Sequence, residues 1–500
     1  MKDKPLRSRI FHLGNGVIRA FFYPLVTISL FAALASANWV PDSGNTTGLT
    51  YLLFLLLFAL AVLPVLFPYF KKGLHFVFVE KRLLTSAILL GLALIWQLAF
   101  VFSTHPAFGF DVGATYHGLH TPNDPTLRAY FSVNYNNVPL LIFLHKLVGA
   151  ASWLTLDLVS AVATDVTALA VIGSVVVLNK KQLPAVFYVT AAWLALFPAG
   201  MMPYTDVWGM LPVALSVFFW SVFVKNKNGL CKVLAAWLAG ASLAFGVWLK
   251  PSTAVWGIAA VLAALLYAVK HKPLLAMLFC ALFAAGFAES YIPLRQASAR
   301  QSLIQVDKSR AIPAIHFVDV GLTHDGAYDP KAALMMDALP TKKQKVAYSK
   351  KQIKKRLHKR GVWGYLAFLV KKQGLNTADG TFGWLHEGHF LTEENPPNWL
   401  GEFIFPKGRY VIEFRICAQI FWTLALVILL CSWQNGGLVY QTLRLALVGT
   451  CLFLLIFEGG RSRYLIQTLP ALLVLTAIST PTAFANLRRF KNALFAKKVS

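Results

Sequence analysis

Acidic residues are scarce in this sequence, which has 21 Asp and Glu against 47 Lys and Arg. Charged residues make up 14% of the chain, whereas about 25% is usual in soluble globular proteins. This shortage of charge excludes an ordinary soluble protein. The net charge of +26 does not indicate nucleic-acid binding, because much of the excess lies in short loops between apolar blocks. No zinc finger, RNA-binding signature or isolated basic domain is present, so we expect no nucleic-acid partner.

Cysteine is also scarce, with five residues and no pair in CxxC spacing. All five lie in or at the ends of apolar segments, where a thiol behaves as a small hydrophobic side chain. The sequence therefore predicts no disulfide framework for an external face.

Long apolar blocks dominate what is present. They recur at lengths of roughly 17–25 residues, which is enough to cross a hydrocarbon core of about 30 Å. The pattern predicts an all-α polytopic membrane protein with about twelve transmembrane helices and bound membrane lipids. We place the spans at 20–39, 49–69, 83–103, 157–178, 183–200, 206–224, 232–249, 252–269, 273–293, 411–432, 438–458 and 464–482.

The apolar segment Val138–Ala151 decides the topology. Its length of about 14 residues suits an interfacial or re-entrant helix better than a crossing. If it does not cross, the basic clusters near Lys180, Lys225 and Lys270 fall on the same side as the basic N-terminus. The positive-inside rule favours that arrangement. We therefore expect a multi-pass protein of the cell membrane with both termini in the cytoplasm.

This topology divides the chain into four parts. Residues 1–82 form a cytoplasmic segment and an added helical hairpin, and 83–293 form a transmembrane core with a first external loop at 104–156. Residues 294–410 are too long for a plain connection, so we expect an extracytoplasmic domain there. Residues 411–500 hold the last spans and a basic tail. The basic stretch Lys342–Arg360 is either a solvated helix face or a contact for anionic lipid headgroups or an anionic polymer.

Polar residues gather at the predicted external helix ends. Asp111 lies in the first external loop, and Asp206 lies in a very short loop between two spans. Basic residues come from other helix ends: Lys250, Arg461 and Arg463. A carboxylate at such a boundary can act as a general base on a hydroxyl, and Lys and Arg can hold a phosphate. The alternative is that these charges only anchor the helix ends.

Two further features leave other chemistry open. His117 and His120 could bind a divalent metal together with Asp111 or Asp124, although the ligand set is incomplete. Asp165 lies inside an apolar span, where a carboxylate is expected to face the bundle interior or a wet cavity.

Several motifs resemble a known family. They are YFSVNYNN at 130–137, PYTD at 203–206, LKPS at 249–252, HFVDVGL at 316–322, GAYDP at 326–330, DGTFGW at 379–384 and GGRSRYL at 459–465. Their order resembles that of the GT-C superfamily of integral membrane glycosyltransferases. It resembles most a group of such proteins from Gram-positive bacteria, some associated with exosortase G. Two departures are that Asn136 replaces the usual Pro after Tyr135, and that Asp111 is followed by Val112.

The resemblance implies a GT-C-like bundle that transfers a sugar from a polyprenyl-phosphate donor to a cell-envelope glycan, lipid or protein outside the membrane. It makes Asp111 the general base and Asp206 a second acidic group that orients acceptor or metal. It assigns the leaving phosphate to the basic residues Lys250, Arg461 and Arg463. It further implies substrate contacts from Tyr204, Asn136 and Asn137, and from His316, Asp379 and Glu387 of the external domain.

The alternative function is a transporter or flippase for a lipid-linked glycan. Such a protein would grip the lipid phosphate with the same basic residues but without transfer chemistry. Transporters usually bind near the bilayer midplane within two repeated halves. No repeat is visible here and the polar residues favour one edge, so only Asp165 supports transport.

Overall fold

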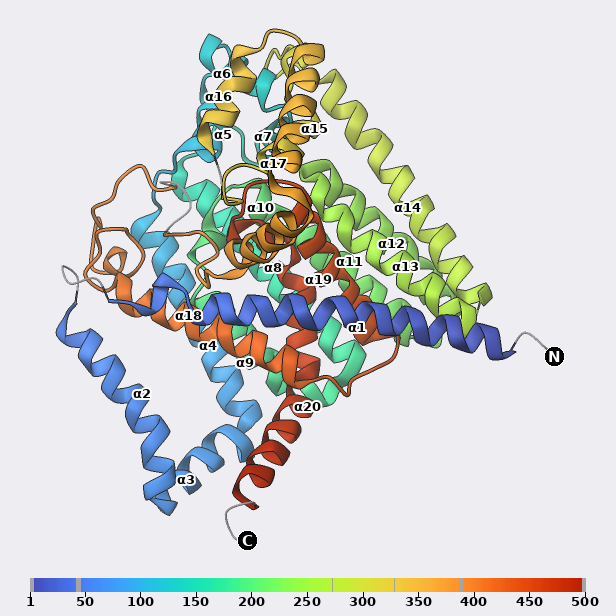
Figure 1. The fold of residues 1–500 in the computed structure, drawn as a ribbon. Helices are drawn as coiled ribbons and strands as arrows, with labels where there is room; N and C mark the ends of the chain where they lie inside the picture. Colours follow the sequence, from blue (N-terminus) through green and yellow to red (C-terminus); the bar gives the residue numbers. More distant parts are fainter. Residues whose placement is uncertain (1–3, 42–45, 272, 328, 386–389, 497–500) are drawn as a thin grey trace.

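The structure is a computed structural model that describes residues 4–41, 46–271, 273–327, 329–385 and 390–496 (Figure 1). It confirms the all-α polytopic fold. Among the described residues, 11 segments are long and apolar enough to cross a membrane. The helices are α1 (Lys4–Leu34), α2 (Gly48–Leu66), α3 (Pro68–His75), α4 (Arg82–Thr104), α5 (Phe110–His120), α6 (Pro125–Val133), α7 (Val138–Val148), α8 (Trp153–Asn179), α9 (Leu183–Ala195), α10 (Thr205–Trp208), α11 (Met210–Lys225), α12 (Gly229–Leu249), α13 (Ala254–Lys270), α14 (Pro273–Arg300), α15 (Ala314–Val320), α16 (Pro330–Ala338), α17 (Lys342–Thr377), α18 (Val411–Cys431), α19 (Leu438–Ile456) and α20 (Leu469–Ala496).

One of the 11 segments, Trp153–Ala195, is 43 residues long and holds two helices. A short 3₁₀ turn at Lys180–Gln182 separates α8 from α9. The chain folds back after this turn. As a result, the Thr164 hydroxyl of α8 donates to the Gly200 carbonyl, which lies beyond the end of α9, at 2.9 Å. This hairpin accounts for two of the spans predicted from the sequence.

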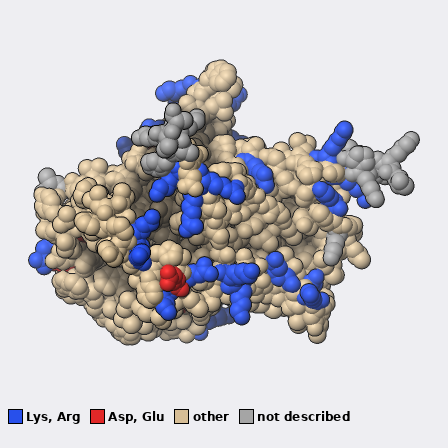
Figure 2. Space-filling view, turned by 90° about the horizontal axis from the view of Figure 1, so that it is seen from below, with Lys and Arg blue, Asp and Glu red and all other residues tan. Residues whose placement is uncertain are grey.

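The helix ends sort into two groups. At one end, the Phe11 ring of α1 meets the Tyr267 ring at the end of α13, with centroids 5.7 Å apart. Arg19 of α1 donates to the Asn435 carbonyl, between α18 and α19, at 3.2 Å. We call this the basic end. Figure 2 shows Lys and Arg gathered on the face seen from below, with little acidic surface among them. The basic end carries the exposed residues Lys71, Lys72, Arg82, Lys180, Lys181, Lys225, Lys227, Arg488 and Arg489. We call the opposite end the site end.

The segment that decided the predicted topology forms a short helix. Helix α7 has 11 residues, a length of about 16 Å at 1.5 Å per residue, and it is not among the candidate spans. Its apolar side packs into a core of its own with α5, Trp208 and Trp248. The short length agrees with the prediction that this segment does not cross.

The first and second spans lie in different surroundings, although we expected them to form an added hairpin. Helix α1 packs against α13, α17, α18 and α19, and its side chains Phe22, Leu25 and Val26 join the main core. Helix α2 is almost entirely exposed to the surroundings of the protein. Only α2 therefore has the character of an addition.

The long segment 294–410 shares the core of the bundle. Phe382, Trp384 and Phe405 belong to the same cluster of buried side chains as the spans. Helix α17 packs against α15, α1 and α19, and Gly361 interrupts it with a φ of 60°. The segment therefore covers the site end and is continuous with the bundle.

Candidate functional site

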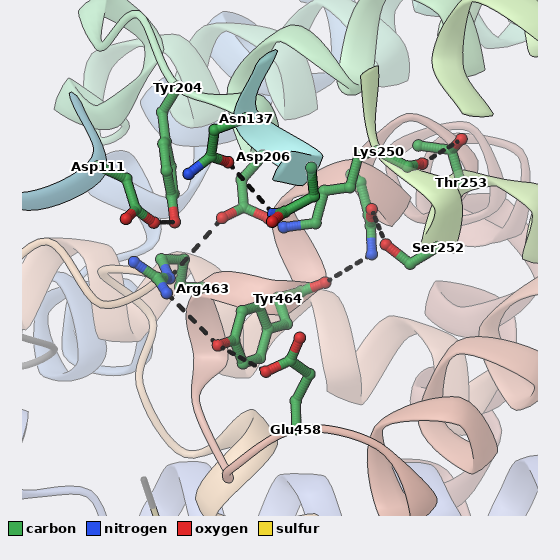
Figure 3. Close-up of polar contacts among 12 residues, drawn as sticks. Asp111, Asn137, Tyr204, Asp206, Lys250, Ser252, Thr253, Glu458, Arg463 and Tyr464 are labelled. Carbon is green, nitrogen blue, oxygen red and sulfur yellow. Dashed lines mark hydrogen bonds and ion pairs between the residues drawn. The ribbon is translucent and has the colours of Figure 1, made fainter. Parts of the chain in front are cut away.

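Four pieces of chain meet at the site end (Figure 3). They are the start of α5, the start of α10, the end of α12, and the 3₁₀ helix Ser462–Thr468 that precedes α20. Each is a point where the chain turns between apolar segments. The turn into α5 is tight: Phe110 has a φ of 48°. A Cβ on Gly113 would lie 2.7 Å from the Phe108 carbonyl oxygen, so this position requires glycine.

Asp111 is held by two tyrosines. Its Oδ1 accepts from the Tyr130 hydroxyl, and its Oδ2 accepts from the Tyr204 hydroxyl at 2.9 Å. The Asn137 amide in turn donates to the Tyr130 hydroxyl at 2.8 Å. Burial, and then the nearby Asp111 charge, raise the pKa of Tyr130. Burial likewise raises the pKa of Tyr204. Both phenols therefore stay protonated and act as hydrogen-bond donors to the carboxylate.

Asp206 forms the centre of a buried ion-pair group. Its side chain is inaccessible to solvent, and its Oδ1 contacts the Lys250 ammonium. Its Oδ2 lies 3.7 Å from Nε of Arg463. Burying a charge is strongly unfavourable unless it is paired, and here one carboxylate faces two cations. Lys250 keeps 17% of its side chain exposed.

Aromatic rings surround the two cations. The Arg463 guanidinium lies over the rings of Tyr204 and Tyr464, each at 5.1 Å, and over Phe390 at 5.4 Å. The Lys250 ammonium lies 5.3 Å from the Tyr464 ring. Such cation–π contacts favour the charged form in a desolvated site. Tyr204 therefore links both sides, because its hydroxyl binds Asp111 and its ring contacts the cations.

Glu458 extends this network. The Tyr464 hydroxyl donates to Oε2 of Glu458 at 3.1 Å and lies 3.4 Å from a terminal nitrogen of Arg463. Burial raises the pKa of Glu458, partly offset by the nearby Lys250 charge. We define the polar cluster as Asp111, Tyr130, Tyr204, Asp206, Lys250, Glu458, Arg463 and Tyr464.

Five residues singled out from the sequence lie in this cluster: Asp111, Tyr204, Asp206, Lys250 and Arg463. Asn137 lies directly behind it, through Tyr130. Asn136 is exposed, and its amide donates to Oδ1 of Asn137 at 3.2 Å. Arg461 is half-buried at the N-cap position of the 3₁₀ helix, two residues before Arg463.

The candidates from the long segment have other surroundings. The buried His316 faces the cations Arg356 and Lys345, and burial followed by these charges lowers its pKa to about 4. The Asp379 carboxylate accepts from the Asn38 amide at 2.8 Å and from the backbone N–H of Gly383 at 2.9 Å. Asp379 thus holds a turn of its own chain against the 3₁₀ helix Ala37–Trp39 that follows α1. Glu387 lies outside the described residues.

A metal centre has little support in the described part of the chain. No group of three His, Cys, Asp or Glu side chains gathers there in a way that could hold an ion. His117 and His120 are exposed on α5, and Nδ1 of His120 lies 2.9 Å from the Tyr116 carbonyl oxygen of its own helix.

Sequence reasoning assigned no role to Tyr130, Glu458 or Tyr464, although Tyr130 and Tyr464 lie in motifs named above and Glu458 directly precedes one of them. For Tyr130, the available signal was its position relative to Asn137 on the other side of a turn, which brings the two side chains together. The Tyr464 hydroxyl contacts its near neighbours Glu458 and Arg463, but its ring also contacts Lys250, which is more than 200 positions away, and no local sequence pattern indicates that contact.

The chain matches, over residues 10–484, the family described as "conserved hypothetical integral membrane protein". The chain belongs to this family. The match confirms the integral membrane assignment and takes in every residue of the polar cluster. None of the curated proteins and none of the solved structures matches the chain.

Proposed function

We propose that this member of the family is a membrane glycosyltransferase of the GT-C type. It would move a sugar from a polyprenyl-phosphate donor to a hydroxyl of a cell-envelope acceptor outside the membrane. One observation carries the proposal: a carboxylate with two tyrosine donors, and two cations paired with a buried carboxylate, converge at one end of the transmembrane bundle. This arrangement supplies a base and a phosphate-binding group within one cluster.

Asp111 would act as the base. A carboxylate has about four lone-pair sites, and the two tyrosines use one on each oxygen. The remaining sites can accept the proton of an acceptor hydroxyl. The tyrosines fix the carboxylate orientation, which a general base needs before the substrate arrives.

Lys250 and Arg463 would bind the phosphate. The acceptor oxygen bonds to the anomeric carbon, the bond from that carbon to the phosphate oxygen breaks, and the acceptor proton moves to Asp111. The bond electrons leave with the polyprenyl phosphate, whose charge the two cations stabilise. Asp206 is their counter-ion when no phosphate is bound.

The location of the cluster also suits a lipid donor. Lys250 follows directly after one candidate span, and Arg463 lies in the first turn of another. A phosphate on a membrane-embedded chain lies at that depth, whereas a water-soluble nucleotide sugar has no need of a site there.

A lipid-linked glycan flippase is the second candidate, favoured by one buried and one half-buried carboxylate within a span. Within the described part of the chain, no hydrogen bond satisfies either oxygen of Asp157 or Oδ1 of Asp165, both on α8. Carboxylates inside spans often mark transport pathways. They lie apart from the polar cluster, so the two candidates make separate predictions.

Reconstitution of the protein in liposomes distinguishes the transferase from the flippase. Purified protein in liposomes would receive a polyprenyl-phosphate sugar and membrane extract as acceptor source. Release of polyprenyl phosphate that depends on Asp111 supports transfer. Movement of intact donor between leaflets without phosphate release would overturn it and favour the flippase. A lipid extract of a deletion strain would then identify the donor by its accumulation.

A further inference from the structure

Helix α17 consists of two differently built halves. Gly361 joins them with φ 60° and ψ −175°, a conformation that side-chain-bearing residues rarely adopt. Figure 1 shows the resulting bend, with the second half crossing in front of the bundle. Neither half takes part in the polar cluster, so the transfer chemistry does not account for their composition.

One face of the first half is used within the protein. The Lys345 ammonium donates to the Arg310 carbonyl. Arg356 contacts the Asp319 carboxylate, and Arg360 donates to the His324 carbonyl at 2.6 Å. These basic residues fasten the half-helix to residues 310–324.

The other face is an exposed basic stripe. Its residues recur at intervals of three, four and seven along the helix, so they lie on one side. Among the residues that the structure describes, none of these side chains has an acidic partner. We define the basic stripe as Lys343, Lys350, Lys351, Lys354, Lys355, His358 and Lys359.

Apolar side chains follow immediately after the bend. Val362 is 74% exposed and Trp363 is 83% exposed, and Leu366 and Val370 are also exposed. Four exposed apolar side chains on little more than two helical turns are unusual on a surface that faces only water.

The depth of this second half follows from its contacts. Gln373 donates to the Ser29 hydroxyl, near the end of α1, at 3.0 Å. Lys372 donates to the Leu455 carbonyl, in the last turn of α19, at 3.2 Å. Both α1 and α19 are candidate spans. The end of the second half, at Lys372 and Gln373, therefore lies level with the last turns of the spans at the site end.

We propose that α17 anchors the site end to the membrane surface through anionic lipid headgroups. The basic stripe contacts the lipid phosphates, and Trp363 with its apolar neighbours enters the boundary between headgroups and acyl chains. Tryptophan is enriched at this boundary, and lysine clusters beside it attract anionic lipids. A soluble anionic polymer would bind the lysines but would leave the apolar residues exposed to water. The anchor stands independently of the proposed transfer reaction.

Fluorescence quenching in nanodiscs tests this anchor on the full-length chain. The five cysteines are replaced by alanine, and a fluorophore is attached at either Lys355→Cys or Trp363→Cys. The nanodiscs contain phosphatidylcholine with or without phosphatidylglycerol, and carry a spin-labelled lipid as quencher. We expect acyl-chain quenchers to quench the fluorophore at position 363 in both lipids. Headgroup quenchers should quench the fluorophore at position 355 severalfold more when phosphatidylglycerol is present.

Charge and salt provide the controls. The triple variant Lys350→Gln, Lys351→Gln, Lys354→Gln should abolish the dependence on phosphatidylglycerol. The triple variant Lys180→Gln, Lys181→Gln, Lys225→Gln removes an equal charge at the basic end. This variant should keep the dependence on phosphatidylglycerol. Salt at about 1 M shortens the Debye length to about 3 Å and should also abolish the dependence.

Two outcomes would overturn the assignment. Quenching at position 363 by aqueous iodide, with none by acyl-chain quenchers, would place the apolar residues in water. A change in the fluorescence of the label at position 355 on addition of soluble dextran sulfate, with no change caused by phosphatidylglycerol, would assign the basic stripe to an anionic polymer.

Discussion

The two long segments at the site end contribute to the polar cluster in different ways. Residues 104–156 supply side chains, because Asp111 and Tyr130 belong to the cluster itself. The described part of 294–410 mainly supplies backbone support. The Phe317 carbonyl accepts from the Glu458 N–H at 2.8 Å, and Lys372 holds the Phe457 carbonyl just before it. The comparison teaches that charged motifs in a long segment between spans can shape the polar cluster without entering it.

Changing Asp111 should have the largest effect. Asp111→Asn keeps the size and an acceptor oxygen but cannot take a proton, so transfer should fall by about 10²–10⁴-fold. The measurement is sugar transfer from a purified lipid donor with folded protein matched for amount. Asp124→Asn is the matched control in the same segment, because Asp124 caps α6 by accepting from the Thr126 N–H at 2.7 Å. Asparagine caps about as well, so this control should stay within about threefold of wild type. Equal activity in both variants would remove Asp111 from the chemistry.

Arg463→Lys should have the next largest effect. Lysine keeps the charge but loses the planar fork and its stacking on Tyr204 and Tyr464. One lost charge-assisted hydrogen bond, at about 1.5–3 kcal/mol, corresponds to roughly a 10- to 100-fold loss of transfer. Arg409→Lys is the control, because Arg409 pairs with Glu402 on the surface of the second segment. Wild-type transfer by the Arg463 variant would exclude a bidentate role.

Lys372→Met should lower stability and leave the chemistry nearly intact. Lys372 is fully buried and donates to three carbonyls, and burial lowers its pKa to about 7. Leaving a buried carbonyl unsatisfied costs about 1–3 kcal/mol, so thermal unfolding in detergent should occur at lower temperature. Lys371→Met is the matched neighbour, because Lys371 is exposed and pairs with Asp325. A large loss of transfer per folded molecule in Lys372→Met would show that the second segment takes part in the reaction as well as supporting the backbone of the polar cluster.

His316→Gln should have the smallest effect, visible only as a change with pH. The pKa of His316 is lowered to about 4, so its contribution to stability is lost as the pH falls from 6.5 through 4. Asp319, beside Arg356, has the opposite sign: burial raises its pKa to about 6, and its contribution is lost as the pH rises through 6. In the wild type, the two groups therefore change the stability in opposite directions as the pH rises.

The variant should therefore be relatively more stable at about pH 4.5 than at about pH 7, when unfolding temperatures of variant and wild type are compared. Transfer at neutral pH should not change, because His316 is already neutral there. A loss of transfer at neutral pH would return His316 to the site.

Much of the fold was predictable because crossing a bilayer requires long apolar runs, which are visible locally. The same logic located Asp111, Asp206, Lys250 and Arg463, since charge is tolerated where those runs end. The partnerships were not predictable. Asp206 and Arg463 are 257 residues apart and meet only because α10 and the 3₁₀ helix before α20 pack together.

The motif around Asp379 shows a second limit of sequence reasoning. Asp-Gly-Thr reads as a functional motif, but Asp side chains also accept hydrogen bonds from their own backbone two residues on. Asp379 does this with the Thr381 N–H at 2.8 Å. Sequence alone cannot separate these uses, because both favour the same residues next to glycine.

The ion pairs of Asp206 determine the electrical balance of the cluster. Asp111 and Asp206 carry two negative charges, and Lys250 and Arg463 carry two positive ones, so the charges of these four side chains balance one another. Under the proposed reaction, a donor phosphodiester becomes a phosphate monoester with one more negative charge as Asp111 becomes neutral. The total charge within the site then stays constant through the step. Product release is thereby linked to the return of one proton from Asp111 to solvent.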